Sequence, residues 1–213
     1  MKKAEHVFTA MLCVFYGVGI AGHIHAVTRH SIVRLTPIVL LVYGLAVLYF
    51  STHLKRRLLV WCACTYVVTF FIEVLGVQTG SVFGQYYYGE MLGVKVLDVP
   101  LVIGFNWVLV VLGAVHLARK MVKNDLLIAA AAGMVTVIFD IPLEVVAVKL
   151  DYWHWTSGGV PLQNYLAWFC ISFIMAYVFC RMKLDVKGNI PVYYLGAQFV
   201  FFIVIAACVP SLN

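Results

Sequence analysis

The chain is organised around one stretch, FIEVLGVQTGSVFGQYYYGEMLGVKVLDVPLVIGFNW, which covers residues 71–107. This stretch places a carboxyl group, Glu73, inside an apolar segment that gives way to a loop rich in glycine and tyrosine. The loop runs from Thr79 to Asp98, and the chain re-enters an apolar segment through Val99-Pro100. Connections of that length are uncommon in compact domains and usually have a function. The pattern therefore predicts two apolar helices joined by a functional loop.

The composition indicates that the apolar segments cross a lipid bilayer. The 213 residues are 64% hydrophobic and 11% charged, with a mean hydropathy of +0.99, whereas about a quarter of the residues in ordinary globular domains are charged. A spanning helix needs about 20 mostly apolar residues and satisfies its own backbone hydrogen bonds. We predict an all-α, polytopic membrane protein with about seven transmembrane helices, at Val7–Val27, Thr36–Thr52, Leu58–Gln78, Val99–Ala118, Leu126–Val148, Gln163–Met182 and Ile190–Val209. We expect residues 1–213 to form a single integral domain in the cell (inner) membrane.

Basic residues are distributed unevenly between the two sides of such a seven-helix chain. Eleven of the 15 lysines and arginines fall on one side, and only Arg29, Arg34, Lys95 and Lys149 fall on the other. The positive-inside rule then places the N-terminus in the cytoplasm and the C-terminus outside. The net charge of +6 is explained by this topology and by contact with anionic lipid, so it gives no support to a nucleic-acid partner. The first window lacks a small-x-small cleavage site, and we expect a retained signal anchor.

A second stretch, from Asp140 to Trp168, repeats the design of the first. Val160-Pro161-Leu162 precedes Trp168 at the same spacing that separates Val99-Pro100-Leu101 from Trp107. Each of these segments follows an aromatic loop and, further back, an acid within an apolar window. We predict that the third and fourth helices and the fifth and sixth helices form parallel internal repeats. Repeats of this kind often enclose a functional site between them.

Three acids within the apolar windows, Glu73, Asp140 and Glu144, are the main candidates for chemistry. A carboxyl group in a spanning segment is costly and by default indicates function. Asp140 and Glu144 are four residues apart, so they share one face of a helix. Because no lysine or arginine lies deep in these windows, each carboxyl group favours its neutral form, which can donate a proton. The alternative is that the acids hold helices together by hydrogen bonds, or that Glu144 reaches the surface.

The polar residues that could hold a metal or cofactor do not form a recognised pattern. His23 and His25 form an isolated HxH that no other histidine cluster completes. All six cysteines lie in apolar windows, and we interpret them as small buried hydrophobic residues. Cys62 and Cys64 are two residues apart and point to different faces of their helix. With no nucleotide-binding glycine loop either, we expect no cofactor and no metal.

Two blocks of residues carry a family resemblance. The first consists of Glu73, Gly76, Thr79-Gly80, Phe83-Gly84, Tyr86, Tyr88, Leu92-Gly93, Val99-Pro100 and Trp107, and the second of Asp140, Tyr152-Trp153, Trp155, Gly159-Val160-Pro161, Asn164 and Trp168. Together they resemble the membrane carotenoid biosynthesis family, of the carotenoid 1,2-hydratase and bisanhydrobacterioruberin hydratase type. The chain departs from the family pattern after Asp140, where Ile141 precedes the proline.

The resemblance implies addition of water to the terminal carbon–carbon double bond of an acyclic carotenoid. A carboxylic acid would protonate the alkene, aromatic faces would stabilise the tertiary cation, and water would capture it. We assign proton donation to Asp140 or Glu73, with preference for Asp140, and the placing of water to Glu144 and Asn106. The predicted substrate-binding residues are Tyr86, Tyr88, Asn106, Trp107, Trp153, Trp155, Asn164 and Trp168. The expected partners are membrane lipid and a long polyene comparable in length to the ~30 Å hydrocarbon core.

Two other functions fit parts of the pattern. A lycopene-type membrane cyclase shares the protonation step but quenches the cation by ring closure, so its product gains no water. A small membrane transporter would also use repeated helices and acids within the membrane. Against a transporter, the polar residues gather near one side of the bilayer and do not line a path through it. The aromatic loops, for their part, could form an ordinary interfacial belt.

Overall fold

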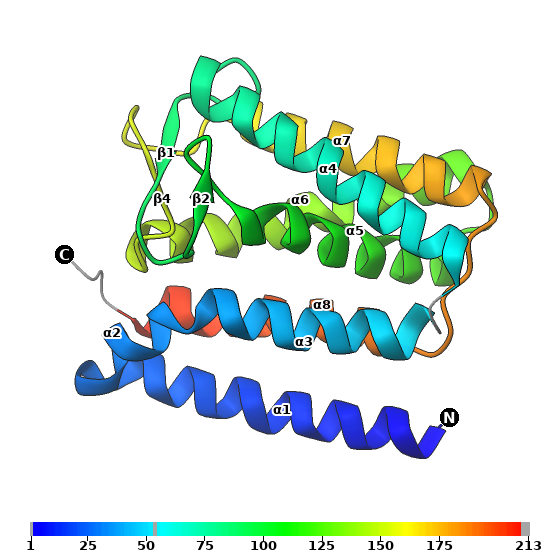
Figure 1. Cartoon of the computed structure of the whole chain (residues 1–213), viewed down its shortest axis with the longest axis horizontal. Coiled ribbons are helices and arrows are strands. Elements are labelled where there is room, and N and C mark those ends of the chain that lie inside the picture. Colours follow the sequence, from blue (N-terminus) through cyan, green and yellow to red (C-terminus); the bar gives the residue numbers. More distant parts are fainter. Residues whose placement is uncertain (1, 53–54, 210–213) are drawn as a thin grey trace.

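The helices of the chain follow the apolar windows of its sequence. A computed structural model describes residues 2–52 and 55–209, which form α1 (Lys2–Ile24), α2 (Ala26–Arg34), α3 (Thr36–Thr52), α4 (Arg56–Thr79), α5 (Leu101–Met121), α6 (Asp125–Lys149), α7 (Leu162–Arg181) and α8 (Ile190–Cys208) (Figure 1). The side chains of residues 2–4 and 52 lie outside the described part. The charges of Lys2 and Lys3, which the topology prediction uses, are therefore outside it as well.

Six of the described helices, α1 and α4 to α8, are long and apolar enough to cross a membrane. The pair of α2 and α3 passes the same test together although the two helices are bent by 58°, which makes up to seven spans. The predicted all-helical fold with about seven apolar helices is confirmed, and it is consistent with a polytopic membrane protein. The connection expected before Thr36 instead contains α2, because the extended backbone of His25 (φ −75°, ψ 119°) interrupts the helix only briefly.

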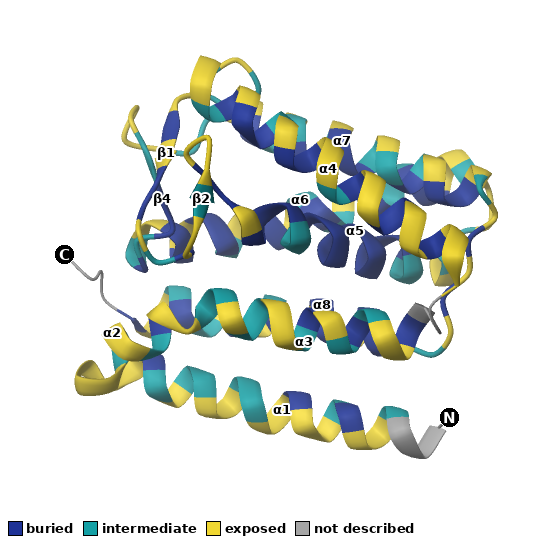
Figure 2. Cartoon of the chain, in the orientation of Figure 1, coloured by how far each residue is buried: buried dark blue, intermediate teal, exposed yellow. Residues whose placement is uncertain are grey.

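The bundle is built around α5. In its apolar window 72% of the residues are buried, against 17% for α1, so α5 is central and α1 is peripheral (Figure 2). Glycines let its neighbours approach closely. A Cβ atom added at Gly104 would lie 3.0 Å from the carbonyl oxygen of Tyr66 in α4, and one at Gly113 would lie 2.9 Å from that of Pro191 in α8. Small residues have this role in membrane helix packing.

The cysteines show how an apolar window differs from a buried one. Cys62 and Cys180 are buried, whereas Cys13, Cys64, Cys170 and Cys208 are exposed on the surface of the bundle. The expectation that all six are buried is therefore wrong for four of them, because lipid-facing positions are as apolar as core positions. The predicted divergence of Cys62 and Cys64 is confirmed, since one is buried and the other exposed.

Two short antiparallel ribbons close one end of the bundle, where the sequence predicted only loops (Figure 1). β1 (Tyr86–Tyr88) pairs with β4 (Trp153–Trp155), so that Tyr86 lies opposite Trp155 and Tyr88 opposite Trp153. β2 (Lys95–Val96) pairs with β3 (Val99–Pro100). Side chains alternate across a strand, and accordingly Tyr86 and Tyr88 are buried while Tyr87 is exposed. The β1–β4 ribbon thus joins the two aromatic loops and directs their side chains toward the acids.

Candidate functional site

Glu73 lies near the ribbon end of α4 and is only 5% exposed. Its Oε2 accepts hydrogen bonds from the hydroxyl groups of Tyr86 (2.6 Å) and Tyr88 (2.7 Å). Its Oε1 accepts a hydrogen bond from the indole N–H of Trp107 (2.8 Å). An indole can only donate, and a carboxylate can accept several such bonds. The three neutral donors stabilise an ionised Glu73, whereas its burial without a cationic partner favours the neutral form that the sequence predicts.

The two tyrosines that serve Glu73 keep their protons. Burial raises the pKa of Tyr86, and the adjacent Glu73 carboxylate raises it further. The same two causes, in the same order, raise the pKa of Tyr88 well above its usual value. Both hydroxyl groups therefore remain donors across the physiological pH range.

A second group of hydrogen bonds surrounds the two acids of α6. Glu144 accepts from the indole N–H groups of Trp153 (2.9 Å) and Trp155 (2.7 Å) through Oε2, and from Nδ2 of Asn164 (3.1 Å) through Oε1. The same nitrogen of Asn164 donates to Oδ2 of Asp140 at 2.7 Å. Oδ1 of Asp140 is buried and has no hydrogen-bond partner among the described residues. The two acids thus share one amide group, and one of their oxygens is left unpaired.

A small cavity of about 30 Å³ lies between Glu73 and Glu144. We call it the polar cavity because these two acids and the amides of Asn106 and Asn164 line it. Its volume is enough for one or two water molecules. Every predicted site residue except Asp140 lines it, together with Phe83, Ile103 and Leu143. Asp140 is fully buried and reaches the site only through its contact with Asn164. The structure therefore brings together side chains from α4, β1, α5, α6, β4 and α7.

Two stacked tryptophans pack beside the cavity. Trp107 in α5 and Trp168 in α7 lie with their ring centroids 4.1 Å apart and an interplanar angle of 28°. Each tryptophan comes six residues after the first residue of its helix, Leu101 or Leu162, and each helix begins directly after a proline. The equal spacing that the sequence shows therefore sets the two indoles at matching depths. Ring–ring contacts of this kind add about 0.5–1.5 kcal/mol to the burial of the side chains.

An apolar cavity of about 250 Å³ adjoins the polar one. The two cavities share four wall residues, Ile103, Asn106, Leu143 and Trp153. Asn106 carries the only amide among these four, so a polar group stands where the water-sized space meets the apolar space. The arrangement places an apolar space next to the water-sized space that Glu73 and Glu144 line.

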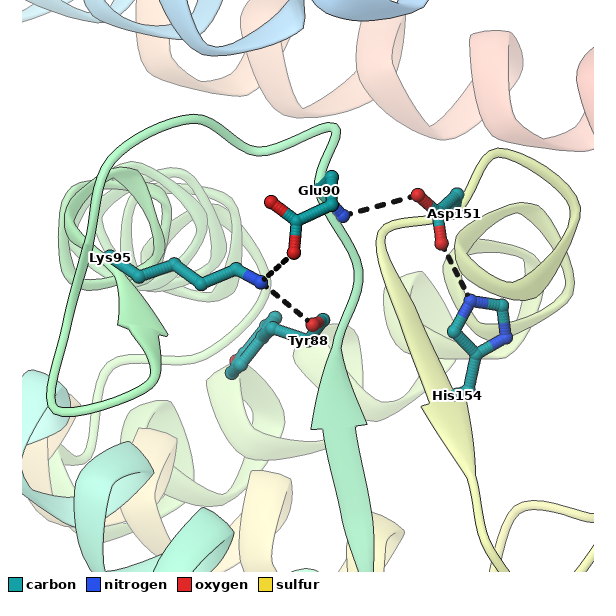
Figure 3. Close-up of polar contacts among 5 residues, drawn as sticks. All are labelled: Tyr88, Glu90, Lys95, Asp151 and His154. Carbon is teal, nitrogen blue, oxygen red and sulfur yellow. Dashed lines mark hydrogen bonds and ion pairs between the residues drawn. The ribbon is translucent and has the colours of Figure 1, made fainter.

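The loops are fastened on their outer side by polar contacts outside the cavity (Figure 3). Asp151 accepts a hydrogen bond from the backbone N–H of Glu90 (3.1 Å) and lies 2.8 Å from Nε2 of His154. Lys95 donates to the carbonyl oxygen of Tyr88 (2.9 Å) and to Oε1 of Glu90 (2.8 Å). The contact of Glu90 with Asp151 joins the turn after β1 to the turn before β4, and Lys95 ties β2 to the end of β1.

Close backbone approach at Gly89 completes this fastening. A Cβ atom added at Gly89 would lie 2.2 Å from the carbonyl oxygen of Asp151, which leaves no space for a side chain. Asp151 itself adopts a left-handed backbone (φ 57°), which aspartate tolerates better than most residues. The turn after β1 and the turn before β4 therefore touch directly.

The structure places the remaining candidates and adds residues that the sequence did not single out. His23 is buried in the wall of the apolar cavity, with Nδ1 2.7 Å from the carbonyl oxygen of Gly19, while His25 is exposed. No group of three or more His, Cys, Asp or Glu side chains in residues 2–52 and 55–209 is arranged to hold a metal ion. Ile103 and Leu143 were missed, because apolar residues in an apolar protein carry no distinguishing signal, and Phe83 stands in the first block of the resemblance but was not predicted to line the site.

Comparison with known proteins relates the chain to carotenoid biosynthesis. The family model described as carotenoid biosynthesis protein matches residues 34–211, a range that contains all three acids and both ribbons. Over 105 residues the chain is 32% identical to the bisanhydrobacterioruberin hydratase of Haloarcula japonica. That alignment covers 46% of this chain and 36% of the relative, so the match spans well under two thirds of the relative's length. No solved structure matches the chain.

Proposed function

The chain belongs to the carotenoid biosynthesis protein family, and we propose that it adds water to the terminal double bond of an acyclic carotenoid. One observation carries the proposal. Glu73 and Glu144 line a cavity of the size of one or two water molecules, and an apolar cavity shares four of its wall residues, among them Asn106. Hydration needs an acid, a water molecule and an alkene at one point, and these two cavities provide a place for each.

The pair of Asp140 and Glu144 is the proposed source of the proton. Two carboxyl groups beside one amide in an apolar environment repel each other when both are charged, so the pair retains a proton. Glu144 lines the cavity and is therefore the member that meets the alkene. Asp140 lies behind it, and its unpaired Oδ1 makes it the acid that gains least from ionising. The proton donor preferred from the sequence, Asp140, thus acts through its neighbour.

The remaining polar groups suit the later steps. Protonation of the terminal alkene gives a tertiary cation, which the Glu73 carboxylate and the faces of Trp153 and Trp155 stabilise. A water molecule held at Asn106 forms the new carbon–oxygen bond and releases its proton to the Glu144 carboxylate. The acids end the cycle as they began it, and the product is a tertiary alcohol. These steps use no redox cofactor.

The proposal includes the orientation of the protein. With the N-terminus in the cytoplasm, the ribbons and all three acids lie toward the outer face of the cell membrane. The two helix pairs, α4 with α5 and α6 with α7, would then be parallel repeats that each contribute one group of acids. The matched positions of Trp107 and Trp168 support this relationship.

Product analysis in a lycopene-producing host tests the proposal. Membranes that contain the full chain should yield carotenoids that have gained the mass of one or two water molecules and carry a tertiary hydroxyl group. Membranes with the Glu144→Gln variant at the same protein level should not. A cyclic product of unchanged mass would show that the protein is a cyclase and not a hydratase. Solute flux in liposomes, with no change in any carotenoid, would identify a transporter instead.

A further inference from the structure

The apolar cavity is lined by helices that lie far apart in the sequence, and it is partly open. Phe15, Tyr16 and Gly19 of α1 form one wall, and Phe201 and Phe202 of α8 form another. α3, α5, α6 and the segments near the ribbons complete the lining. Most of the surface that faces the space is apolar, and the polar side chains in the lining include His23, Thr36, Asn106 and Gln198. The cavity therefore suits a hydrocarbon.

The wall formed by α1 and most of α2 precedes residue 34, where the family match begins. The acids and ribbons of the site lie within the match. The α1 wall of the cavity thus lies outside the matched range, whereas the walls formed by α3, α5, α6 and α8 lie within it. Because α1 limits the volume of the apolar cavity, it limits how much of a ligand can enter that cavity.

The volume of the cavity limits its occupant. An apolar cavity of about 150 Å³ accepts a benzene molecule, so 250 Å³ accommodates about ten carbon atoms at the same density. Ten carbons correspond to two isoprene units. Because the cavity shares Ile103, Asn106, Leu143 and Trp153 with the polar one, a polyene that fills it ends against the wall of the cavity that Glu144 lines.

We propose that this apolar cavity holds the last two isoprene units of the carotenoid, with α1 as the wall that determines how deeply the end group enters. The proposal rests on the hydration function and assigns its substrate a place. Gly19 is the position at which α1 leaves room for the polyene. A Cβ atom added there would meet only Cε2 of Phe201, at 3.7 Å, which is ordinary van der Waals contact. A larger side chain at Gly19 extends into the cavity and occupies the space of the substrate.

The same helix offers a matched control. Gly17 is exposed, and a Cβ atom added there would have no neighbour within 4 Å. Gly19→Leu and Gly17→Leu therefore make the same change to the helix propensity of α1, in favour of the helix. Only the first of them reduces the cavity.

Retention of lycopene provides the test, and it does not depend on turnover. Each variant is combined with Glu144→Gln, produced as the full chain in lycopene-producing membranes, and purified in detergent. Bound polyene is measured by its visible absorbance per protein molecule, and a thermal melt shows that the fold is intact. We expect Gly19→Leu to lower the bound polyene at least about fivefold, a loss of roughly 1 kcal/mol of binding free energy, and Gly17→Leu to leave it unchanged.

The outcomes separate this inference from the proposed function. Equal retention by Gly19→Leu and Gly17→Leu overturns the cavity proposal, even where the parent chain hydrates lycopene. Selective loss in Gly19→Leu supports the cavity proposal, even where no hydrated product is found and the proposed reaction fails. Release of a phospholipid instead of the polyene in Gly19→Leu overturns the proposal, because the occupant is then a bilayer lipid.

Discussion

The two halves of the candidate site solve the burial of acids in different ways. In the half made by α4, β1 and α5, one acid receives three donors and both of its oxygens are paired. In the half made by α6, β4 and α7, two acids share three donor side chains, and one oxygen is left without a partner. The first half is suited to a charge and the second to a proton. The difference indicates a division of roles within one cavity.

The two halves also differ in the hydrogen-bond donors that surround their acids. Glu73 is held by two phenols and one indole, whereas Glu144 is held by two indoles and the amide of Asn164. The amide nitrogen of Asn164 also contacts Asp140, which couples the second acid to the first. Because indoles are weak acids that only donate, Trp153 and Trp155 cannot take a proton from the alkene cation or from water. In the proposed reaction, proton transfer in this half therefore falls to the carboxyl groups.

The largest effect should come from Glu144→Gln. The amide keeps the size of the side chain but cannot supply a proton, and general acid catalysis is worth about 100- to 10,000-fold. We expect hydration to fall at least about 1,000-fold, measured as hydroxylated carotenoid per protein molecule. Glu90→Gln is the control, because the Glu90 side chain is 84% exposed and outside the cavity, and it should retain full activity. Turnover by Glu144→Gln near that of the parent would show that this half does not supply the proton.

Glu73→Gln should have the next largest effect. One oxygen that accepts from the tyrosines or Trp107 becomes an NH₂ group, so a donor is left unpaired and the negative charge beside the cation is lost. Loss of one stabilising group of this kind costs about 100-fold in rate. The measurement is the hydration rate at saturating lycopene, together with the thermal midpoint. A loss larger than that of Glu144→Gln would reverse the roles assigned to the two halves.

The tyrosines of β1 provide a finer comparison within one strand. Tyr86→Phe and Tyr88→Phe each remove one hydroxyl donor to Glu73 and should each reduce hydration about tenfold, since a hydrogen bond to a charged group is worth about 1.5–3 kcal/mol. Tyr87→Phe removes an exposed hydroxyl from the same strand and should have no effect. Equal activity in all three variants would show that the hydrogen bonds to Glu73 do not contribute to the reaction.

The smallest effect should come from His154→Gln. The contact of His154 with Asp151 is partly exposed, at 21% and 29% of the two side chains, and exposed ion pairs contribute about 0–1 kcal/mol. We expect hydration to stay within about twofold of the parent and the free energy of unfolding to fall by less than about 1 kcal/mol. A severe loss of activity would show that His154 takes part in the reaction and does not only fasten the loops.

The sequence predicted much of this site because its signals are local. A carboxyl group in an apolar window is visible at Glu73, Asp140 and Glu144, and the spacing of Trp107 and Trp168 from their prolines is visible as well. The pairing of Tyr86–Tyr88 with Trp153–Trp155 was not predicted. Its register depends on how α4, α5 and α6 bring the two loops together, and neither loop has the alternating apolar pattern that marks a strand.

The apolar cavity could not be predicted for a different reason. In water, a buried face is distinguished from an exposed one by its hydrophobicity, but in lipid both faces are apolar. Nothing in the residues around Tyr16 or Phe201 separates a cavity wall from a lipid-facing surface. The depth of Asp140 was hidden in the same way, since a helix period places it on the face of Glu144 without giving its distance from the cavity.

The pairing of β1 with β4 also sets the order in which the site can come into existence. Tyr86–Tyr88 and Trp153–Trp155 are separated along the chain by α5 and α6, both long enough to cross the bilayer. The ribbon cannot close until both of these helices have been synthesised and inserted. Glu73 is therefore synthesised before the walls of its cavity that α5, α6, β4 and α7 provide, and the candidate site can be completed only late in the biogenesis of the chain.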